Sequence, residues 1–270
     1  MAHTPKLPTF VRVIAMRLRL YIILLFGSLL FTENSFSQSA QQALDKGQDV
    51  NVLFRNESTG SIFMHSRGFG ANYRRLWHVT GTKKRFIEIE GLNMSHPKEQ
   101  KVKRDRGKSY YYGKLNSLFF LRAGYGYLQT LYRRAERKSL EVRMNYGVGP
   151  SICFAKPVFL EVQYLDTLSG GADNYIYKTE AYDPAKHNQN NILGRAPMFY
   201  GLGSTKIYPG AYAKLGFSFE YGEMRNSIKA LEVGAVVDFF PVAVPTMAKF
   251  PAENFFVTLY LGFHFGKRWF

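Results

Sequence analysis

Five side chains that can exchange protons lie inside apolar stretches of the chain. They are Glu161, Glu220, Glu232, Asp238 and His264. A hydrolase needs a nucleophile, a general base beside it and an acid that orients the base. When carboxylates share the narrow interior of a protein with arginines and lysines, they are more often ion-pair partners than catalytic groups. We therefore predict no catalytic residues and a protein that is not an enzyme.

Lysines and arginines alternate with apolar residues in the same way as these acids do, and they would neutralise the acids. Glu141 and Arg143, for example, alternate with apolar residues in the segment "LEVRM". Opposite charges that share one interior are expected to pair with each other. The sequence predicts interior ion pairs among Arg122, Arg143, Lys214, Glu141, Glu161, Glu220, Glu232 and Asp238.

The chain offers no pattern typical of a metal or cofactor site. Its histidines lack the spacing of zinc ligands, and the aspartates between residues 166 and 183 lack the spacing of a calcium loop. Cys153 is the one cysteine, so an internal disulfide is excluded. We predict no metal and no cofactor, and we interpret Cys153 as a small inward-facing side chain.

The elements that position these residues alternate strictly between two kinds of side chain. The closing stretch, 255–270, reads "FFVTLYLGFHFGKRWF". Every second residue from Phe255 to Phe265 is bulky and apolar, whereas Thr258, Tyr260 and His264 lie on the other face. Such alternation is typical of a β-strand with two different faces.

The same pattern recurs upstream and predicts an all-β fold. We expect eight strands within the ranges 68–79, 86–94, 115–132, 139–154, 158–164, 211–221, 229–240 and 255–265. Residues 61–67 are interpreted as an extension of the first strand across a bulge at Gly68. Eight strands close in sequence indicate a closed, antiparallel, up-and-down β-barrel.

The amino-terminal segment has the order of a secretory signal peptide. Four basic residues precede the apolar run 21–31, which is too short to span a bilayer comfortably, and small residues at Ser35 and Ser37 offer a cleavage site. We predict a signal peptide at 1–37, a lead-in at 38–60 and a barrel at 61–270. An amino-terminal membrane anchor is the alternative.

The charges indicate which face of the strands lies inside. Ten charges of the strands, among them Glu88, Glu90 and Arg122, fall on faces rich in small residues and glycine, whereas Arg75 does not follow the pattern. A narrow barrel places such faces in its lumen, where opposite charges pair, and turns the apolar faces to lipid. A secreted soluble barrel or sandwich is the competing interpretation.

In these features the chain resembles small outer-membrane β-barrel proteins of Gram-negative bacteria. The resemblance rests on the signal peptide, the alternating strands and the aromatic final strand, and the cleavage site before Gln38 resembles those of the Bacteroidota. It implies an outer-membrane location and contact with barrel-assembly machinery during insertion. The assembly signal that the resemblance implies would be carried by Phe263, Phe265, Trp269 and Phe270.

If both barrel ends of the chain are periplasmic, as the resemblance implies, the predicted strands assign each loop to a side. Segments 80–84, 133–138, 165–207 and 241–253 would lie outside, with 165–207 a long outer loop. Segments 95–111, 155–156 and 222–225 would be periplasmic. One strand more or fewer would move 95–111 outside.

Two groups of cations are candidate contact surfaces. The predicted periplasmic turn 95–111 would dock an acidic partner through Lys98, Lys101, Lys103, Arg104, Arg106 and Lys108. An outer rim that binds lipopolysaccharide phosphates would consist of Lys83, Lys84, Arg133, Arg134, Arg137 and Lys138. Solvated turns are the alternative for both. Nucleic acid is not expected as a partner, although the net charge is +16.

These predictions favour a non-enzymatic outer-membrane barrel that serves as a structural or accessory subunit of an envelope assembly or secretion complex. One alternative is a narrow channel or small-solute porin, which interior ion pairs would obstruct. The other is a lipid A-modifying or proteolytic enzyme. Lipid A deacylase barrels carry His-x-Ser near the end, whereas here Gly266 follows His264.

Overall fold

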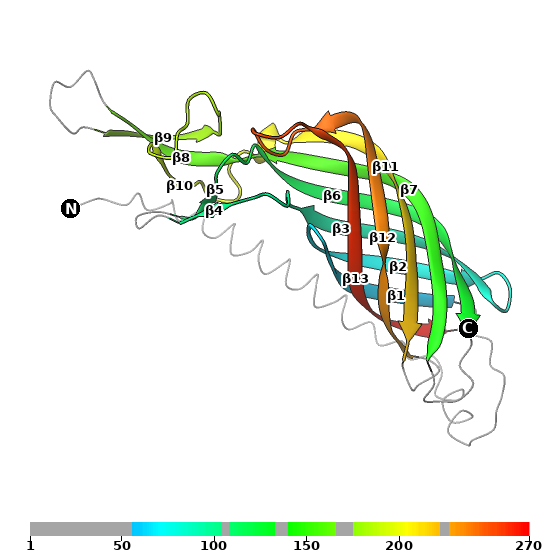
Figure 1. Cartoon of the computed structure of the whole chain (residues 1–270). Coiled ribbons are helices and arrows are strands. Elements are labelled where there is room, and N and C mark those ends of the chain that lie inside the picture. The colour runs from blue at the N-terminus through cyan, green and yellow to red at the C-terminus, as the bar shows by residue number, and fades with distance from the viewer. Residues whose placement is uncertain (1–55, 104–107, 133–139, 166–174, 222–226, 270) are drawn as a thin grey trace, which may run out of the picture. The chain divides into compact units, whose positions relative to one another are not determined.

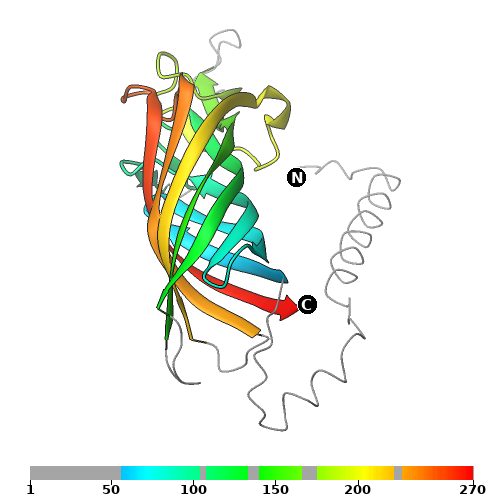
Figure 2. The same ribbon diagram turned by 90° about the vertical axis from the view of Figure 1, so that its right-hand side faces the viewer.

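The computed structural model describes residues 56–103, 108–132, 140–165, 175–221 and 227–269. The predicted signal peptide and most of the lead-in lie outside these residues. Eight strands form a closed barrel in the order β1-β13-β12-β11-β7-β6-β3-β2 (Figures 1 and 2). They are β1 (Asn56–His65), β2 (Gly68–His78), β3 (Lys83–Met94), β6 (Asn116–Tyr132), β7 (Glu141–Pro157), β11 (Lys206–Glu220), β12 (Ser227–Val244) and β13 (Glu253–Trp269). All neighbouring pairs are antiparallel, so the predicted fold class is confirmed.

The alternation of β13 separates an apolar outer surface from the lumen. Phe255, Leu259 and Phe263 are exposed on one face of the strand, whereas Phe256 and His264 are buried on the other face. Other strands do the same and leave large apolar side chains on the outside, among them Ile62, Met64, Phe69, Ile87, Ile89, Phe119, Val148, Leu215 and Val237. Because no protein covers this belt in the described structure, its residues pack against whatever surrounds the barrel.

Two of the predicted strand assignments are wrong. Residues 61–67 do not extend the next strand across a bulge; most of them belong to β1, which begins at Asn56 inside the predicted lead-in and forms a hairpin with β2. A Cβ at Gly68 would lie 2.5 Å from the carbonyl oxygen of Asn93, so only glycine fits where the chain leaves the turn.

The second wrong assignment is 158–164, which is not a barrel strand. Residues Phe159–Leu165 form β8, the centre of a separate 3-stranded sheet of order β10-β8-β9. In this sheet β9 spans Tyr175–Ala181 and β10 spans Ile192–Arg195. The two errors cancel in the strand count, but between β2 and β7 they reverse the direction of every strand.

This reversal changes the end of the barrel assigned to three predicted loops, 80–84, 95–111 and 133–138, whereas 165–207, 222–225 and 241–253 keep theirs. Asn56 pairs with both Trp269 and Trp77, which defines a terminal end of the barrel. The connections 79–82, 133–140 and 221–226 join strands at the terminal end, whereas 95–115, 158–205 and 245–252 join strands at the opposite end, here the loop end. The basic turn therefore shares its end with the long loop, and the segments around 80–84 and 133–138 lie at the other.

The described parts of the long connections at the loop end build one hydrogen-bonded platform, defined here as residues 95–103, 108–115, 158–165, 175–205 and 245–252. Val158 donates its amide to the carbonyl of Leu115, and Leu115 donates to Thr246, at 2.9 and 3.0 Å. Tyr110, Leu160, Val162, Tyr182 and Ile192 are the main members of its buried apolar core. The platform also contains the short pair β4 (Lys101–Val102) and β5 (Tyr110–Tyr111) and the 3-10 helix η1 (Leu202–Ser204).

Candidate functional site: the lumen and the loop-end platform

Three phenylalanines close the lumen towards the loop end. Phe120, Phe240 and Phe256 are fully buried and meet edge to face, with ring centroids 5.2 to 5.8 Å apart. Edge-to-face contact is the favoured arrangement for such rings. The layer is continuous with Leu118, Val236 and Val244, so the mouth of the barrel is filled with apolar side chains.

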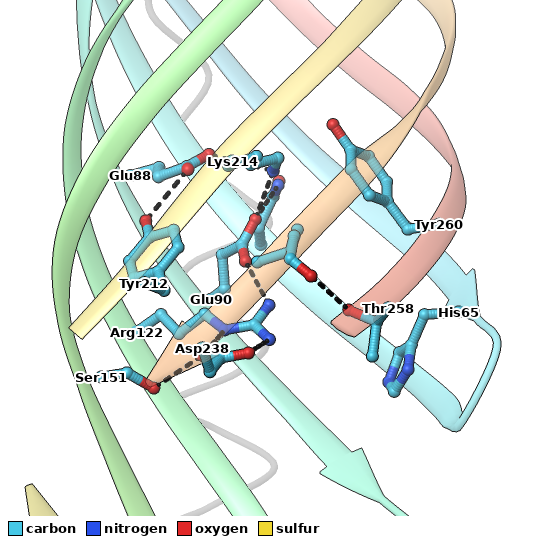
Figure 3. Close-up of polar contacts among 12 residues, drawn as sticks. His65, Glu88, Glu90, Arg122, Ser151, Tyr212, Lys214, Asp238, Thr258 and Tyr260 are labelled. Atoms are coloured by element: carbon cyan, nitrogen blue, oxygen red, sulfur yellow. Dashed lines mark hydrogen bonds and ion pairs between the residues drawn. The ribbon is translucent and has the colours of Figure 1, made fainter. Parts of the chain in front are cut away.

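Below these rings lies a cluster of buried charges (Figure 3). Arg122 binds Asp238 in a bidentate manner, with Nε–Oδ1 and Nη2–Oδ2 distances of 2.9 and 2.5 Å, and reaches Glu90 at 3.2 Å. Lys214 lies 2.5 Å from the other oxygen of Glu90. Ser151 donates to Asp238 at 3.0 Å. Each carboxylate therefore has a cation or hydroxyl on both oxygens, as a buried charge requires.

The network continues across the lumen through Arg74. Its guanidinium lies 2.9 Å from Glu88 and 3.0 Å from Glu232. The hydroxyls of Tyr212 and Tyr260 donate to these two carboxylates at 3.1 and 2.9 Å. This arrangement links β2, β3, β11, β12 and β13 through their inward side chains and braces the barrel wall.

A second charge cluster fills the terminal end. Glu57 accepts from Lys84 at 2.5 Å and from Arg268 at 2.7 Å. Arg268 also binds Glu220 at 2.6 Å, and Arg143 pairs with both Glu220 and Glu141. Between the two clusters lie the buried side chains of Leu76, Phe86 and Leu128.

Filled in this way, the lumen leaves little room for a solute. Two cavities between described side chains of the lumen measure about 10 and 20 Å³, each large enough for about one water molecule. In the described residues Ser151 has no imidazole within hydrogen-bonding distance, and no group of three or more histidine, cysteine or acidic side chains could hold a metal.

Seven of the eight predicted ion-pair residues lie in these clusters; Glu161 does not. It projects from β8, outside the barrel, because that strand belongs to the platform. Four further participants were not predicted as interior ion-pair residues: Glu57, Arg74, Lys84 and Arg268. The signal was present for Arg268, which has the same parity along β13 as His264.

The predicted lipopolysaccharide rim does not form as expected. Lys84 is buried in the lumen on Glu57, and Lys83 lies at the terminal end with its Nζ 4.3 Å from the Tyr127 ring centroid. Arg133, Arg134, Arg137 and Lys138 lie outside the described residues. Their connection leaves the barrel at the terminal end, away from the long loop with which they were expected to lie.

The predicted partner turn lies at the loop end. The Nζ of Lys98 is 4.6 Å from the ring centroid of Phe250, and Lys101 belongs to β4. Lys108 accepts a backbone hydrogen bond from Arg195 of β10. Lys103 follows β4, and Arg104 and Arg106 lie outside the described residues. The turn is part of the platform and is not on the opposite side from it.

The residues of the predicted assembly signal lie near the end of β13. Phe263 and Phe265 face outwards with about half of their surface exposed, and Trp269 is 36% exposed. Phe270 lies outside the described residues. The aromatic side chains of the final strand thus belong to the apolar belt.

On the platform, β9 offers an open edge. The amide of Tyr182 bonds to the carbonyl of Val158, and hydrogen-bonded pairs recur at every second residue of an antiparallel ladder. The backbone groups of Lys178 therefore face β8, and those of Tyr177 and Thr179 face away from it. Among the described strands only β8 pairs with β9.

Two exposed aromatic side chains, Tyr175 and Tyr177, belong to β9 itself. Phe199 and Tyr200, in the segment that precedes η1, are also exposed, and the ring centroid of Tyr200 lies 5.3 Å from that of Phe159 in β8. Beneath the sheet, Tyr182 is packed in the core, and burial raises its pKa to about 12, so it stays neutral. The edge thus joins backbone groups that no described strand pairs with to the exposed tyrosines of β9, on a firmly packed base.

His187 holds the turn between β9 and β10 in place. Its Nδ1 accepts from the amide of Asp183 at 3.0 Å, and its Nε2 lies 3.1 Å from the hydroxyl of Tyr164. The same hydroxyl donates to Glu180 at 3.2 Å. These contacts fix β9 and the turn that follows it to β8.

Comparisons with known proteins found no matching family model and no matching curated protein. Among solved structures, Neisserial surface protein A (NspA) is 8% identical, with 80% of this chain and 97% of that chain covered and a TM-score of 0.39. The N-terminal β-barrel domain of Pseudomonas aeruginosa OprF is 8% identical, with 79% and 99% covered and a TM-score of 0.34.

A third similar structure is Ail, the attachment invasion locus protein of Yersinia pestis, in complex with the heparin analogue sucrose octasulfate. It is 7% identical, with 80% of this chain and 100% of that chain covered and a TM-score of 0.38. At these identities and scores the likenesses carry no argument about function. No helix in the described residues is long and apolar enough to cross a membrane. The strand pairing itself establishes a closed barrel of eight antiparallel strands.

Proposed function

We propose that the protein is a non-enzymatic β-barrel of the outer membrane. The apolar belt supports this location, because exposed Phe, Leu, Ile and Val side chains on the barrel exterior would be costly in water and are favourable in lipid. The buried charges pair with one another inside the lumen, as a membrane-spanning barrel requires. Outer-membrane barrels have short periplasmic turns and longer outer loops, so we assign the loop end to the outside.

Within that location, we propose that the barrel anchors a binding platform at the cell surface. The observation that carries the proposal is the open edge of β9, with exposed aromatic residues beside it. An extended segment of a partner protein can add to such an edge as a further strand, held by main-chain hydrogen bonds. The protein would then be a structural or accessory subunit of an envelope or secretion complex whose partner is reached from outside.

The basic turn fits the same proposal. Its described cations share the loop end with β9 and would meet acidic groups on the partner or on lipopolysaccharide there. The described terminal end has short connections, and its inward charges are already paired. Partner contact is therefore expected at the loop end.

Orientation can be tested with a cysteine at the platform surface. Tyr175→Cys should be labelled by a membrane-impermeant maleimide on intact cells, since the side chain is exposed at the loop end. The native Cys153 is buried and serves as the internal control. Labelling only after the outer membrane is opened would reverse the proposed orientation.

The binding role can be tested by cross-linking from the β9 edge. A photo-reactive phenylalanine in place of Tyr177 should give a protein adduct in cells. Thr179→Pro should abolish that adduct, because proline removes an N–H that faces the open edge while the bonds to β8 remain. Lys206→Gln, on β11, is the control and should keep the adduct. An adduct unaffected by Thr179→Pro would exclude strand addition.

A further inference from the structure

Both tryptophans of the chain lie together on the outer surface of the barrel at the terminal end. Trp77 and Trp269 are opposite Asn56 from its two sides in the strand register. The guanidinium carbon of Arg75 is 5.6 Å from the Trp77 ring centroid and 5.8 Å from that of Trp269. That of Arg85 is 5.9 Å from Trp77. Two arginines are thus held against two indole rings.

Small side chains lie between the two sides of this cluster. Ser58 of β1 is paired with Lys267 on one side and with Arg75 on the other, and Gly60 follows two residues later. The nearest atom to a Cβ built at Gly60 would be 3.9 Å away, so the interior packing does not require glycine there. Ser58 and Gly60 therefore leave a shallow depression in the outer surface between their bulkier neighbours.

Among the described residues the cluster is cationic and has no acid paired with it. Arg75, Arg85 and Lys267 are exposed, and none of them takes part in an ion pair among the described residues. The carboxylates of the described barrel strands are buried in the lumen or paired near a strand end, as Glu141 and Glu253 are. Exposed cations beside a lipid-facing belt favour an anionic ligand.

We propose that the Arg75–Trp77–Arg85–Trp269 cluster is a binding site for an anionic glycerophospholipid, such as phosphatidylglycerol. The guanidinium groups match the oxygens of a phosphodiester. The indole rings lie at the depth where one edge is apolar and the other meets headgroups. The acyl chains pass over Gly60 towards Ile62 and the apolar belt.

This inference rests on the proposed membrane location and orientation. In that orientation the terminal end faces the periplasm, and the lipids around it are glycerophospholipids of the inner leaflet. The same cations would meet lipopolysaccharide only if the barrel were inserted the other way. The proposal therefore commits to phospholipid, and lipopolysaccharide becomes an outcome of the test.

The position of the two tryptophans provides a direct measurement. The barrel is reconstituted in phosphatidylcholine bilayers that contain either dibrominated phosphatidylglycerol or dibrominated phosphatidylcholine, and quenching of tryptophan fluorescence is titrated. Phosphatidylglycerol should displace phosphatidylcholine from the cluster with a preference of about five-fold per arginine. Arg75→Gln/Arg85→Gln should remove that preference.

Two further variants sharpen the result. Lys156→Gln/Lys206→Gln removes two cations at the loop end and should leave the preference unchanged. Gly60→Leu raises the surface between the tryptophans without altering charge and should weaken phosphatidylglycerol binding. Migration of unheated samples on a gel establishes that each variant has folded.

Several outcomes would overturn the inference. Equal quenching by the two lipids in the unaltered barrel would refute the site while leaving the membrane location intact. Absence of quenching by either lipid would refute both together. Displacement of brominated phosphatidylglycerol by lipopolysaccharide at lower concentration than by phosphatidylglycerol itself would reassign the ligand.

Discussion

Gly124 shows how the lumen accommodates its large polar side chains. A Cβ at this position would overlap the hydroxyl of Tyr212, which donates to Glu88 at 3.1 Å. The glycine therefore leaves the space that the tyrosine needs to reach the charge network. Its role is a close approach across the lumen rather than backbone flexibility.

We expect Gly124→Ala to lower the free energy of unfolding by about 1–3 kcal/mol, since the added methyl must displace Tyr212. In a Tyr212→Phe background the same change should cost less, because the overlapping oxygen is gone. Urea unfolding in detergent, followed by tryptophan fluorescence, measures both. Gly60→Ala is the matched control, and an equal cost in both backgrounds would contradict the explanation.

Asp238 carries a second prediction at this scale. Asp238→Ala leaves the buried Arg122 with Glu90 as its one ion-pair partner among the described residues and should cost about 3–5 kcal/mol. Arg122→Met/Asp238→Ala should be more stable than the single variant, because no unpaired charge remains at that place. If the double variant proves the less stable one, the pair is not what holds these strands.

Single residues were predictable where alternation alone places them. Arg122, Lys214 and Asp238 lie inside because each shares parity with the small residues of its strand. Lys84 escaped prediction because it was interpreted as part of a loop, although it has the same parity as Glu88 in β3. Which cation meets which acid could not be predicted, since strand register sets those pairs.

At the scale of elements, the hairpin of β1 and β2 decides the topology. The pairing of Ile62 with Phe263 requires β1 to lie beside β13 and close the barrel. An outward row of apolar side chains does not identify the neighbouring strand. In a sequence, two strands are recognised as a hairpin from the turn residues between them. Ser66 and Arg67, which join β1 and β2, carry no strong turn signal.

Barrel closure at this register can be tested by a disulfide. Ile62→Cys/Phe263→Cys should oxidise to a cross-link within the folded barrel, because paired residues of adjacent strands have Cα separations that a disulfide can span. Ile62→Cys/Leu259→Cys, with partners about 13 Å apart along β13, should stay reduced. Gel mobility before and after reduction distinguishes the two, and cross-linking of the second pair alone would require another register.

The 158–164 segment misled for a related reason. It alternates as a barrel strand does, and β8 is indeed a strand. One face of β8 packs in the platform core around Leu160 and Val162, and the other face lies on the surface. Alternation therefore indicates a half-buried sheet but does not identify the sheet to which the strand belongs. The platform itself could not be predicted, because its core joins residues from two connections distant in sequence.

At the scale of the whole molecule, the charge is divided between interior and exterior. The described lumen holds six Lys and Arg side chains, against seven Asp and Glu side chains. The net charge of +16 therefore comes from the two ends of the barrel, from its outer surface and from the segments outside the described residues. The barrel interior is nearly neutral, as a filled lumen in lipid must be.

A filled lumen predicts the absence of steady ion conduction. In planar bilayers the purified barrel should give no stable open state, because apolar rings and paired charges occupy the path. Phe120→Ala/Phe240→Ala/Phe256→Ala should still give none, since the charge clusters remain below. Long-lived open-state currents from the unaltered protein would show that the network rearranges in the membrane.

Only Val158 separates β7 from β8, so a nearly continuous strand runs from the barrel wall into the platform. A pull on a partner bound at β9 would pass along this strand into the wall. There β7 is bonded on both edges, to β6 and β11, and the force would act parallel to the strands. Many backbone bonds would share such a load at once, so a platform with the proposed binding role would resist being pulled from the barrel.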